Sequence, residues 1–266
     1  MNDRRGYWLF APRDEKAHPV PRRVALANGA LVFAVLAVLL WLAFRRLDYH
    51  WNWTVIWRYR VQFIAGWWMT LGISIASLML STLIGLCFAL AARSRFLPLR
   101  ALSRIYVSLV RGTPLLVQIL VFYYVIADAF HLENRLAAGV LTLSLFSGAY
   151  IAEVIRGGID SVGKSQRESA LAIGLTRAQM YRYVILPQAL RQILPALAGQ
   201  FVSLVKDSSL LSIISIEEFT LRAQEVNSAT FSTLECYLPL AAGYLLITLP
   251  IAAAARRLEG RIRYET

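Results

Sequence analysis

A polar cluster directly follows one of the apolar stretches of the chain. The uncharged run 192–205 contains Pro195 and ends at two adjacent ionisable residues, Lys206 and Asp207. An interrupted helix at membrane depth lines a cavity or packs within protein, because lipid cannot satisfy free backbone amides, and ionisable groups at that depth are candidates for function. A structural alternative is that Lys206 extends to the membrane interface while Asp207 begins a helix cap. The residues that we predict to line or gate a polar pathway are Gln200, Lys206, Asp207 and Ser208.

Residue types that often bind metals or take part in catalysis do not form a recognisable site elsewhere in the sequence. The three histidines, His18, His50 and His131, are widely separated and lack the spacing of metal ligands. The two cysteines, Cys87 and Cys236, suggest neither a metal site nor a disulfide framework. The chain also has no glycine-rich phosphate loop and no convincing set of nucleophile, base and acid. We therefore expect no catalytic residue, no metal and no cofactor bound by this chain.

The composition places these residues in a membrane protein. The chain has 266 residues, of which 58% are hydrophobic and 17% charged, whereas soluble domains average about 45–50% apolar and about 25% charged residues. About 20 apolar residues cross a bilayer as a helix. We predict an all-α integral membrane protein with about six transmembrane helices. The uncharged stretches on which this count rests are 24–44, 61–92, 112–127, 136–152, 192–205 and 236–255.

The distribution of basic residues predicts how the chain is oriented. If both termini are cytoplasmic, most Lys and Arg residues fall in cytoplasmic segments, as the positive-inside rule requires. The net charge of +12 then faces anionic lipid, and it does not indicate nucleic-acid binding. Four arginines between 45 and 60 contradict this assignment, so a five-span chain with a non-crossing 24–44 helix is the alternative. The remaining segments are a basic tail at 1–23, an external aromatic loop at 45–60, a core at 61–255 and a basic tail at 256–266.

The long polar insert 156–187 is patterned as a helical hairpin. Ser165 and Glu168 have the spacing of a capping box, and Gly174 is placed to end the helix that they open. This first helix would expose small and apolar side chains, including Ala170 and Leu171. An apolar helix presented outside the bilayer typically binds in a groove of another protein.

A second helix is predicted directly after this glycine. Thr176 and Gln179 repeat the capping-box spacing, and Pro187 would end the helix because it lacks an amide hydrogen. The basic residues of the insert leave another interpretation open, in which the hairpin lies on the lipid surface.

Several motifs in the insert and around it resemble one protein family. The run from Glu168 to Leu197 is similar to the EAA loop of binding-protein-dependent ABC importer permeases: Glu168, Ala170 and Gly174 match, and Ser169 replaces the usual alanine. The strings RGTPLLVQ (111–118), AYIAEVIRGGI (149–159) and KDSSL (206–210) resemble the polar amino acid permeases of the histidine and glutamine type. The resemblance covers roughly 51–263, so the helix at 24–44 is an addition to a five-helix core.

This resemblance implies an assembly and a function. Members of the family are transmembrane subunits that pair with a like or related subunit, two cytoplasmic ATPase subunits and an external solute-binding protein. The implied function is import of a polar amino acid or a related small solute across a bacterial inner membrane, with ATP bound and hydrolysed by the partner. Alternatives from the residues themselves are a stand-alone secondary transporter and a membrane assembly protein. The residues that the resemblance assigns to ATPase docking are Glu168, Ala170, Leu171 and Gly174.

Overall fold

The computed structural model describes residues 21–45 and 49–263. Most of the predicted basic tail at 1–23, and the last three residues of the tail at 256–266, lie outside the described residues. All regular elements in the described ranges are helices. The chain divides into two units, Met1–Trp51 and Asn52–Thr266, and each is considered by itself.

The first unit contains a single described helix, α1 (Arg22–Arg45), which covers the uncharged stretch 24–44. Its segment Arg23–Leu42 is long and apolar enough to cross a membrane, with a mean hydropathy of 2.4. The ring of Phe44, in the last turn of α1, lies with its centroid 6.2 Å from that of Trp51.

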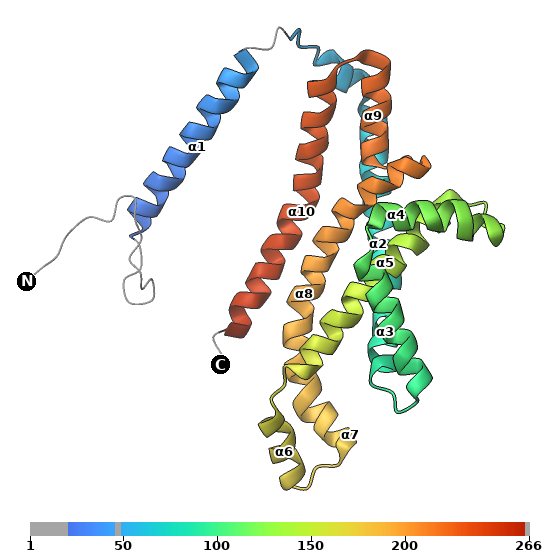
Figure 1. Cartoon of the computed structure of the whole chain (residues 1–266). Helices are drawn as coiled ribbons and strands as arrows, with labels where there is room; N and C mark the ends of the chain where they lie inside the picture. The colour runs from blue at the N-terminus through green and yellow to red at the C-terminus, as the bar shows by residue number, and fades with distance from the viewer. Residues whose placement is uncertain (1–20, 46–48, 264–266) are drawn as a thin grey trace, which may run out of the picture. The chain divides into compact units, whose positions relative to one another are not determined.

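The second unit is a bundle of long helices connected by shorter ones (Figure 1). Two π-helices, η1 and η2, and one 3₁₀-helix, η3, continue the α-helices that precede them. The elements are α2 (Thr54–Ala92), α3 (Leu97–Gly112), α4 (Leu115–Val121), η1 (Phe122–Ala127), α5 (Arg135–Asp160), α6 (Lys164–Ala172), α7 (Arg177–Met180), η2 (Tyr181–Ile185), α8 (Leu186–Asp207), η3 (Ser208–Ile214), α9 (Phe219–Thr230) and α10 (Thr233–Arg263).

The number of candidate spans agrees with the sequence. Across the described residues, five helices are long and apolar enough to cross a membrane, and the number rises to six if one bent pair is counted as a span. The external loop predicted at 45–60 is shorter than expected, because α2 begins at Thr54.

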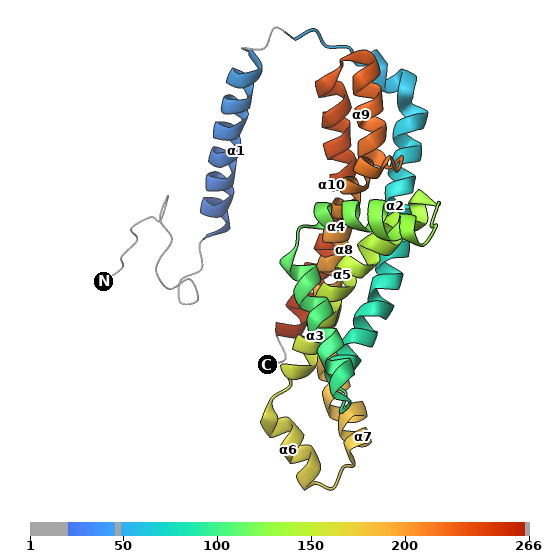
Figure 2. The ribbon, with the colours of Figure 1, turned by 45° about the vertical axis from the view of Figure 1, so that its right-hand side comes forward.

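The bent pair differs from the straight crossing predicted over 112–127. The axes of α3 and the helix of 115–127 meet at 110°, so α4 runs across the other helices (Figures 1 and 2). The bend occurs at Thr113 and Pro114, where Thr113 is extended with φ −123° and ψ 145°. Proline disfavours the helical conformation in the residue before it, so the sequence Thr-Pro forces a break here.

Close packing of α2 against α5 forms the centre of the bundle. A Cβ at Gly85 would lie 2.6 Å from Ile151, and the Ser144 hydroxyl reaches the Ser77 carbonyl at 3.4 Å. Small residues and serine hydroxyls are the usual contacts between membrane helices, because they let two backbones approach closely. Ile151 and Ile185 are fully buried in the adjoining hydrophobic cluster, which also connects α5 to the hairpin.

Pro187 does not end a helix, contrary to our prediction. The segment Arg177–Ile214 is a single candidate span, and Pro195 also lies inside helix α8 without interrupting it. The π-helix η2 precedes Pro187, which occupies the first turn of α8. A wider π turn and a first-turn position both accommodate a residue without an amide hydrogen.

Candidate functional site

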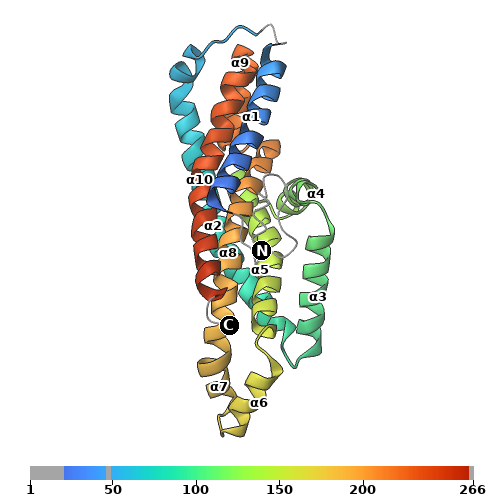
Figure 3. The ribbon, with the colours of Figure 1, turned by 90° about the vertical axis from the view of Figure 1, so that its left-hand side faces the viewer.

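The helices α6 and α7 form a hairpin at one end of the second unit, at the opposite end from α9 (Figures 1 and 3). The capping box predicted for the start of α6 is absent. Gly163 is the N-cap, and no side chain bonds to the first amides. Ser165 is therefore already a helical residue, so its hydroxyl is not placed to cap. Glu168 instead pairs with Lys164 at 3.4 Å, with 64% of its side chain exposed.

The glycine corner and the second cap are both confirmed. Gly174 has φ +86°, its amide donates to the Leu171 carbonyl at 3.0 Å, and the Leu175 amide donates to the Ala170 carbonyl at 3.1 Å. This pair of bonds is the Schellman motif, in which glycine adopts the left-handed conformation at least cost. Thr176 then opens α7 with a complete capping box. Backbone groups are thus satisfied on both sides of the corner, which makes the hairpin a defined element.

The C-terminal end of α6 exposes two large apolar side chains, but not every side chain that we expected to be exposed. Leu171 and Ile173 are 49% and 76% exposed. Ala170 is only 3% exposed, because it packs with Val162 and Met180 inside the hairpin. Our expectation that Ala170 lies on the exposed face is therefore wrong. A side chain larger than alanine at this position would displace the core that supports Leu171.

Polar contacts connect the hairpin to the ends of two long helices. The Arg93 guanidinium, at the end of α2, donates to Asp160 at 2.7 Å and to the Tyr181 hydroxyl at 3.2 Å. Asp160 is the last residue of α5, and Tyr181 begins η2 beyond the hairpin. Arg167 of α6 also donates to the Ile159 carbonyl at 2.7 Å. We call the contact of Arg93 with Asp160 and Tyr181 the arginine clamp.

The four pathway candidates lie on α8 and η3 but do not form one cluster. Gln200 donates to the Ser147 hydroxyl of α5 at 3.3 Å. Ser208 is fully buried and donates to the Val205 carbonyl at 2.8 Å. Lys206 is exposed, and Asp207 is partly buried. In the described part of the chain, no hydrogen bond or ion pair joins the side chains of these four residues.

A buried carboxylate at the other end of the bundle was not predicted. Glu218 is fully buried, and it accepts hydrogen bonds from the amides of Thr220 and Leu221, each at 2.8 Å. The Tyr244 hydroxyl of α10 donates to it at 3.0 Å, and the Thr70 hydroxyl of α2 approaches at 3.4 Å. Glu218 therefore caps α9 while it connects three helices. The only sequence pattern that could have indicated Glu218 is an acidic residue directly before a helix.

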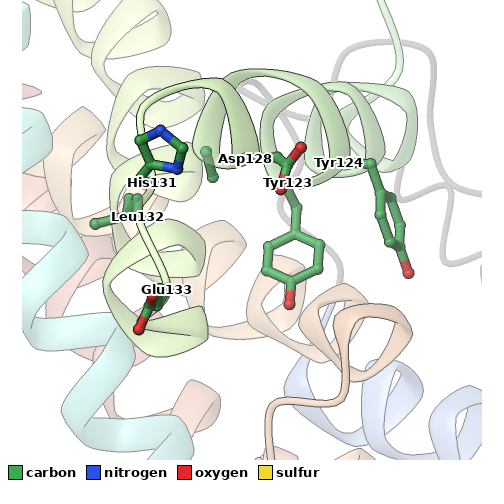
Figure 4. Close-up of a pocket in the computed structure, with 7 residues that line it drawn as sticks. Tyr123, Tyr124, Asp128, His131, Leu132 and Glu133 are labelled. Carbon is green, nitrogen blue, oxygen red and sulfur yellow. The ribbon is translucent and has the colours of Figure 1, made fainter.

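A polar pocket of about 480 Å³ lies where η1 ends (Figure 4). Tyr123 and Tyr124 project from the helix on the side of Asp128, while His131 and Glu133 belong to the turn that follows. His131 adopts φ +54° in this turn. Among the described residues, no group of three or more His, Cys, Asp or Glu side chains is placed to hold a metal ion.

Comparison with known proteins identifies the family. Residues 81–264 match the model of the binding-protein-dependent transport system inner membrane component. The chain is 38% identical over 215 residues to the glutamine transport system permease protein of Escherichia coli (strain K12), covering 80% of this chain and 98% of that protein. It is 35% identical over 201 residues to a probable glutamine ABC transporter permease protein of Bacillus subtilis (strain 168), covering 76% of this chain and 93% of that protein.

Solved structures are also similar to this chain. The crystal structure of an amino acid ABC transporter with histidines matches with a TM-score of 0.75 and 36% identity, covering 80% of this chain and all of that one. The methionine ABC transporter MetNI matches with a TM-score of 0.64 at 18% identity, which shows a common fold. The chain belongs to the family of inner membrane components of binding-protein-dependent transport systems.

Proposed function

We propose that this chain is the transmembrane permease subunit of an ABC importer for a polar amino acid or a related small solute. The glutamine permeases among its relatives and the similar amino acid transporter support this substrate class. The observation that carries the proposal is the hairpin itself. Its second helix is capped, its corner is a left-handed glycine, it exposes Leu171 and Ile173, and the arginine clamp joins the long helices beside it.

The proposed assembly contains a second permease subunit, two ATPase subunits that bind ATP, and an external solute-binding protein. Leu171 and Ile173 would enter a groove on the ATPase, with Glu168 beside them and Gly174 setting the direction of the corner. An exposed apolar helix face that binds in a groove is a recurrent mode of recognition. The family and its bacterial relatives support an inner membrane location, and the basic residues favour an orientation with the hairpin and both termini in the cytoplasm.

Coupling requires that nucleotide binding favour one conformation of the membrane helices over another, because a ligand shifts an equilibrium only through its differential affinity. The hairpin can transmit a movement of the ATPase to the membrane helices, because its internal contacts resist deformation. Movement of the ATPase would then displace the ends of α2 and α5 through Arg93 and Asp160. We propose that Gln200 and Lys206 line the polar pathway, with Asp207 nearby and Ser208 supporting the helix from inside.

Co-purification tests the docking step directly. Leu171→Asp places a charge in the proposed interface, so the ATPase subunits should no longer purify with the permease. Gln188→Asp is the matched control, because Gln188 is an exposed glutamine of α8, outside the hairpin. Equal recovery of ATPase activity with the wild-type protein and the Leu171 variant, at equal membrane abundance, would refute the docking proposal.

A further inference from the structure

A second pocket lies beside α3, α5 and the end of α2, with a volume of about 440 Å³. Its charged lining residues are Arg104 and Arg111 of α3 and Glu153 and Arg156 of α5. Ala92 also lines it, and this is the last residue of the uncharged stretch of α2. The pocket therefore lies where the apolar part of the bundle gives way to a charged surface.

The charges in the pocket do not balance. Glu153 is shared by Arg111 at 3.1 Å and Arg156 at 2.8 Å, and Arg156 also reaches Asp160 at 3.2 Å. Arg104 is exposed and has no hydrogen-bond or ion-pair partner in the described part of the chain. With Asp160 counted, three guanidinium groups are balanced by two carboxylates, which leaves one positive charge in excess.

Free hydrogen-bond donors accompany this charge. Ser108 follows Arg104 by four positions, so the two side chains lie on the same face of α3. Ser108 is exposed and also lacks a partner among the described residues. A guanidinium presents several N–H donors in a planar fork, and together with a hydroxyl it fits the oxygens of a phosphate.

We propose that this pocket binds the phosphate group of an acidic membrane phospholipid. Two observations favour a lipid over a soluble anion. The pocket lies at the edge of the apolar stretch of α2, which is the level of a headgroup. In addition, Ile105 and Leu109 are 56% and 63% exposed and each follows a polar residue of the pocket, so acyl chains can pack beside a bound headgroup. Basic pockets at this level of membrane helices are suited to anionic lipids.

The lipid site goes beyond the transport function, and it does not depend on which solute is carried. Arg104 supplies the unpaired charge, while Arg111 and Arg156 hold Glu153 and shape the wall. Replacement of Arg104 therefore removes ligand contacts without breaking a described contact of the fold.

The proposed lipid site is tested by how much phosphatidylglycerol the protein retains. The full chain is placed in nanodiscs of phosphatidylcholine with an increasing share of phosphatidylglycerol, and the phosphatidylglycerol that stays bound is counted by native mass spectrometry. We expect Arg104→Gln to weaken retention about tenfold, because a charge-assisted hydrogen bond is lost. Arg95→Gln is the matched control, since Arg95 is an exposed arginine just before α3 and outside the pocket. This control should retain lipid as the wild-type protein does.

Two results would overturn the proposal. Equal retention by the Arg104 and Arg95 variants would show that lipid responds only to overall charge. Displacement of phosphatidylglycerol from the wild-type protein by millimolar inorganic phosphate or free glutamate would assign the pocket to a soluble anion. The lipid site is supported if Arg104→Gln alone reduces phosphatidylglycerol retention and if phosphate and glutamate do not displace this lipid from the wild-type protein.

Discussion

Arg93 and Asp160 are 67 positions apart in the sequence, yet the guanidinium of one donates to the carboxylate of the other at 2.7 Å. Their helices, α2 and α5, both end here, and the Tyr181 hydroxyl completes the contact from the far side of the hairpin. A displacement of the hairpin must therefore move both helix ends or break this contact. The arginine clamp therefore joins the helix ends on both sides of the proposed docking element, and Arg167 of α6 adds a bond to the Ile159 carbonyl of α5.

Loss of the clamp should separate ATP hydrolysis from transport. We expect Arg93→Gln to reduce solute uptake per ATP hydrolysed about fivefold, corresponding to about 1 kcal/mol for a partly exposed ion pair. Uptake and ATPase activity of the assembled transporter in proteoliposomes measure this ratio. Arg95→Gln changes the charge equally without touching the clamp and should leave the ratio unchanged. An unchanged ratio in the Arg93 variant would contradict the role of the clamp.

The left-handed corner at Gly174 should not tolerate a branched side chain. No atom lies within 4 Å of a Cβ built there, so the cost of Gly174→Val comes from φ +86° and amounts to about 1–2 kcal/mol. We expect Gly174→Val to lower ATPase co-purification, while Gly174→Asn, which tolerates this conformation, should lower it less. Equal losses in the two variants would show that contact with the partner, and not backbone strain, dominates.

Ser165 and Thr176 of the hairpin should respond differently to substitution by alanine. Thr176→Ala removes the cap of α7 and should destabilise its first turn by about 1 kcal/mol. Ser165→Ala should have almost no effect, because Ser165 makes no capping bond. The hydrogen-exchange rates of the amides at 177–180 in the Thr176 variant and at 164–168 in the Ser165 variant measure the two effects. Faster exchange in α6 of the Ser165 variant would mean that the predicted capping box does form.

Glu218 should contribute to stability far more than its neighbour. Glu218→Ala leaves the amides of Thr220 and Leu221 without their buried acceptor, and we expect a loss of about 3 kcal/mol. Glu217→Ala removes a side chain that is 56% exposed and should cost less than about 0.5 kcal/mol. Thermal unfolding in detergent measures both. Similar midpoints for the two variants would exclude Glu218 as a structural hub.

Prediction from sequence worked best where the signal was local or was spread over a whole helix. Long uncharged runs indicated the membrane helices, and the glycine and capping-box spacing indicated the corner at Gly174 and the start at Thr176. Both depend on residues that are close along the chain. The bend at Pro114 could have been inferred from the same local rule, because Thr113 precedes a proline.

Other features depended on tertiary contacts. Ser165 and Glu168 had the right spacing for a cap, but α6 begins at Lys164 with Gly163 as its N-cap, two residues earlier than that capping box requires. The burial of Ala170 depends on Met180 across the hairpin, and the role of Glu218 depends on Thr70 and Tyr244 in helices that are distant in sequence. No spacing rule brings such residues together, since their partners are set by how the bundle packs.

The π-helix η2 is a wide turn between the docking element and α8. A π turn accommodates one more residue than an α turn, so it absorbs that residue locally. Deletion of one residue between Tyr181 and Ile185 would therefore convert the segment to a regular helix and leave α6 and α7 facing the same way. The same deletion within α8, where each residue turns the chain by about 100°, would rotate Leu171 away from its present side, although no residue of the docking surface had changed.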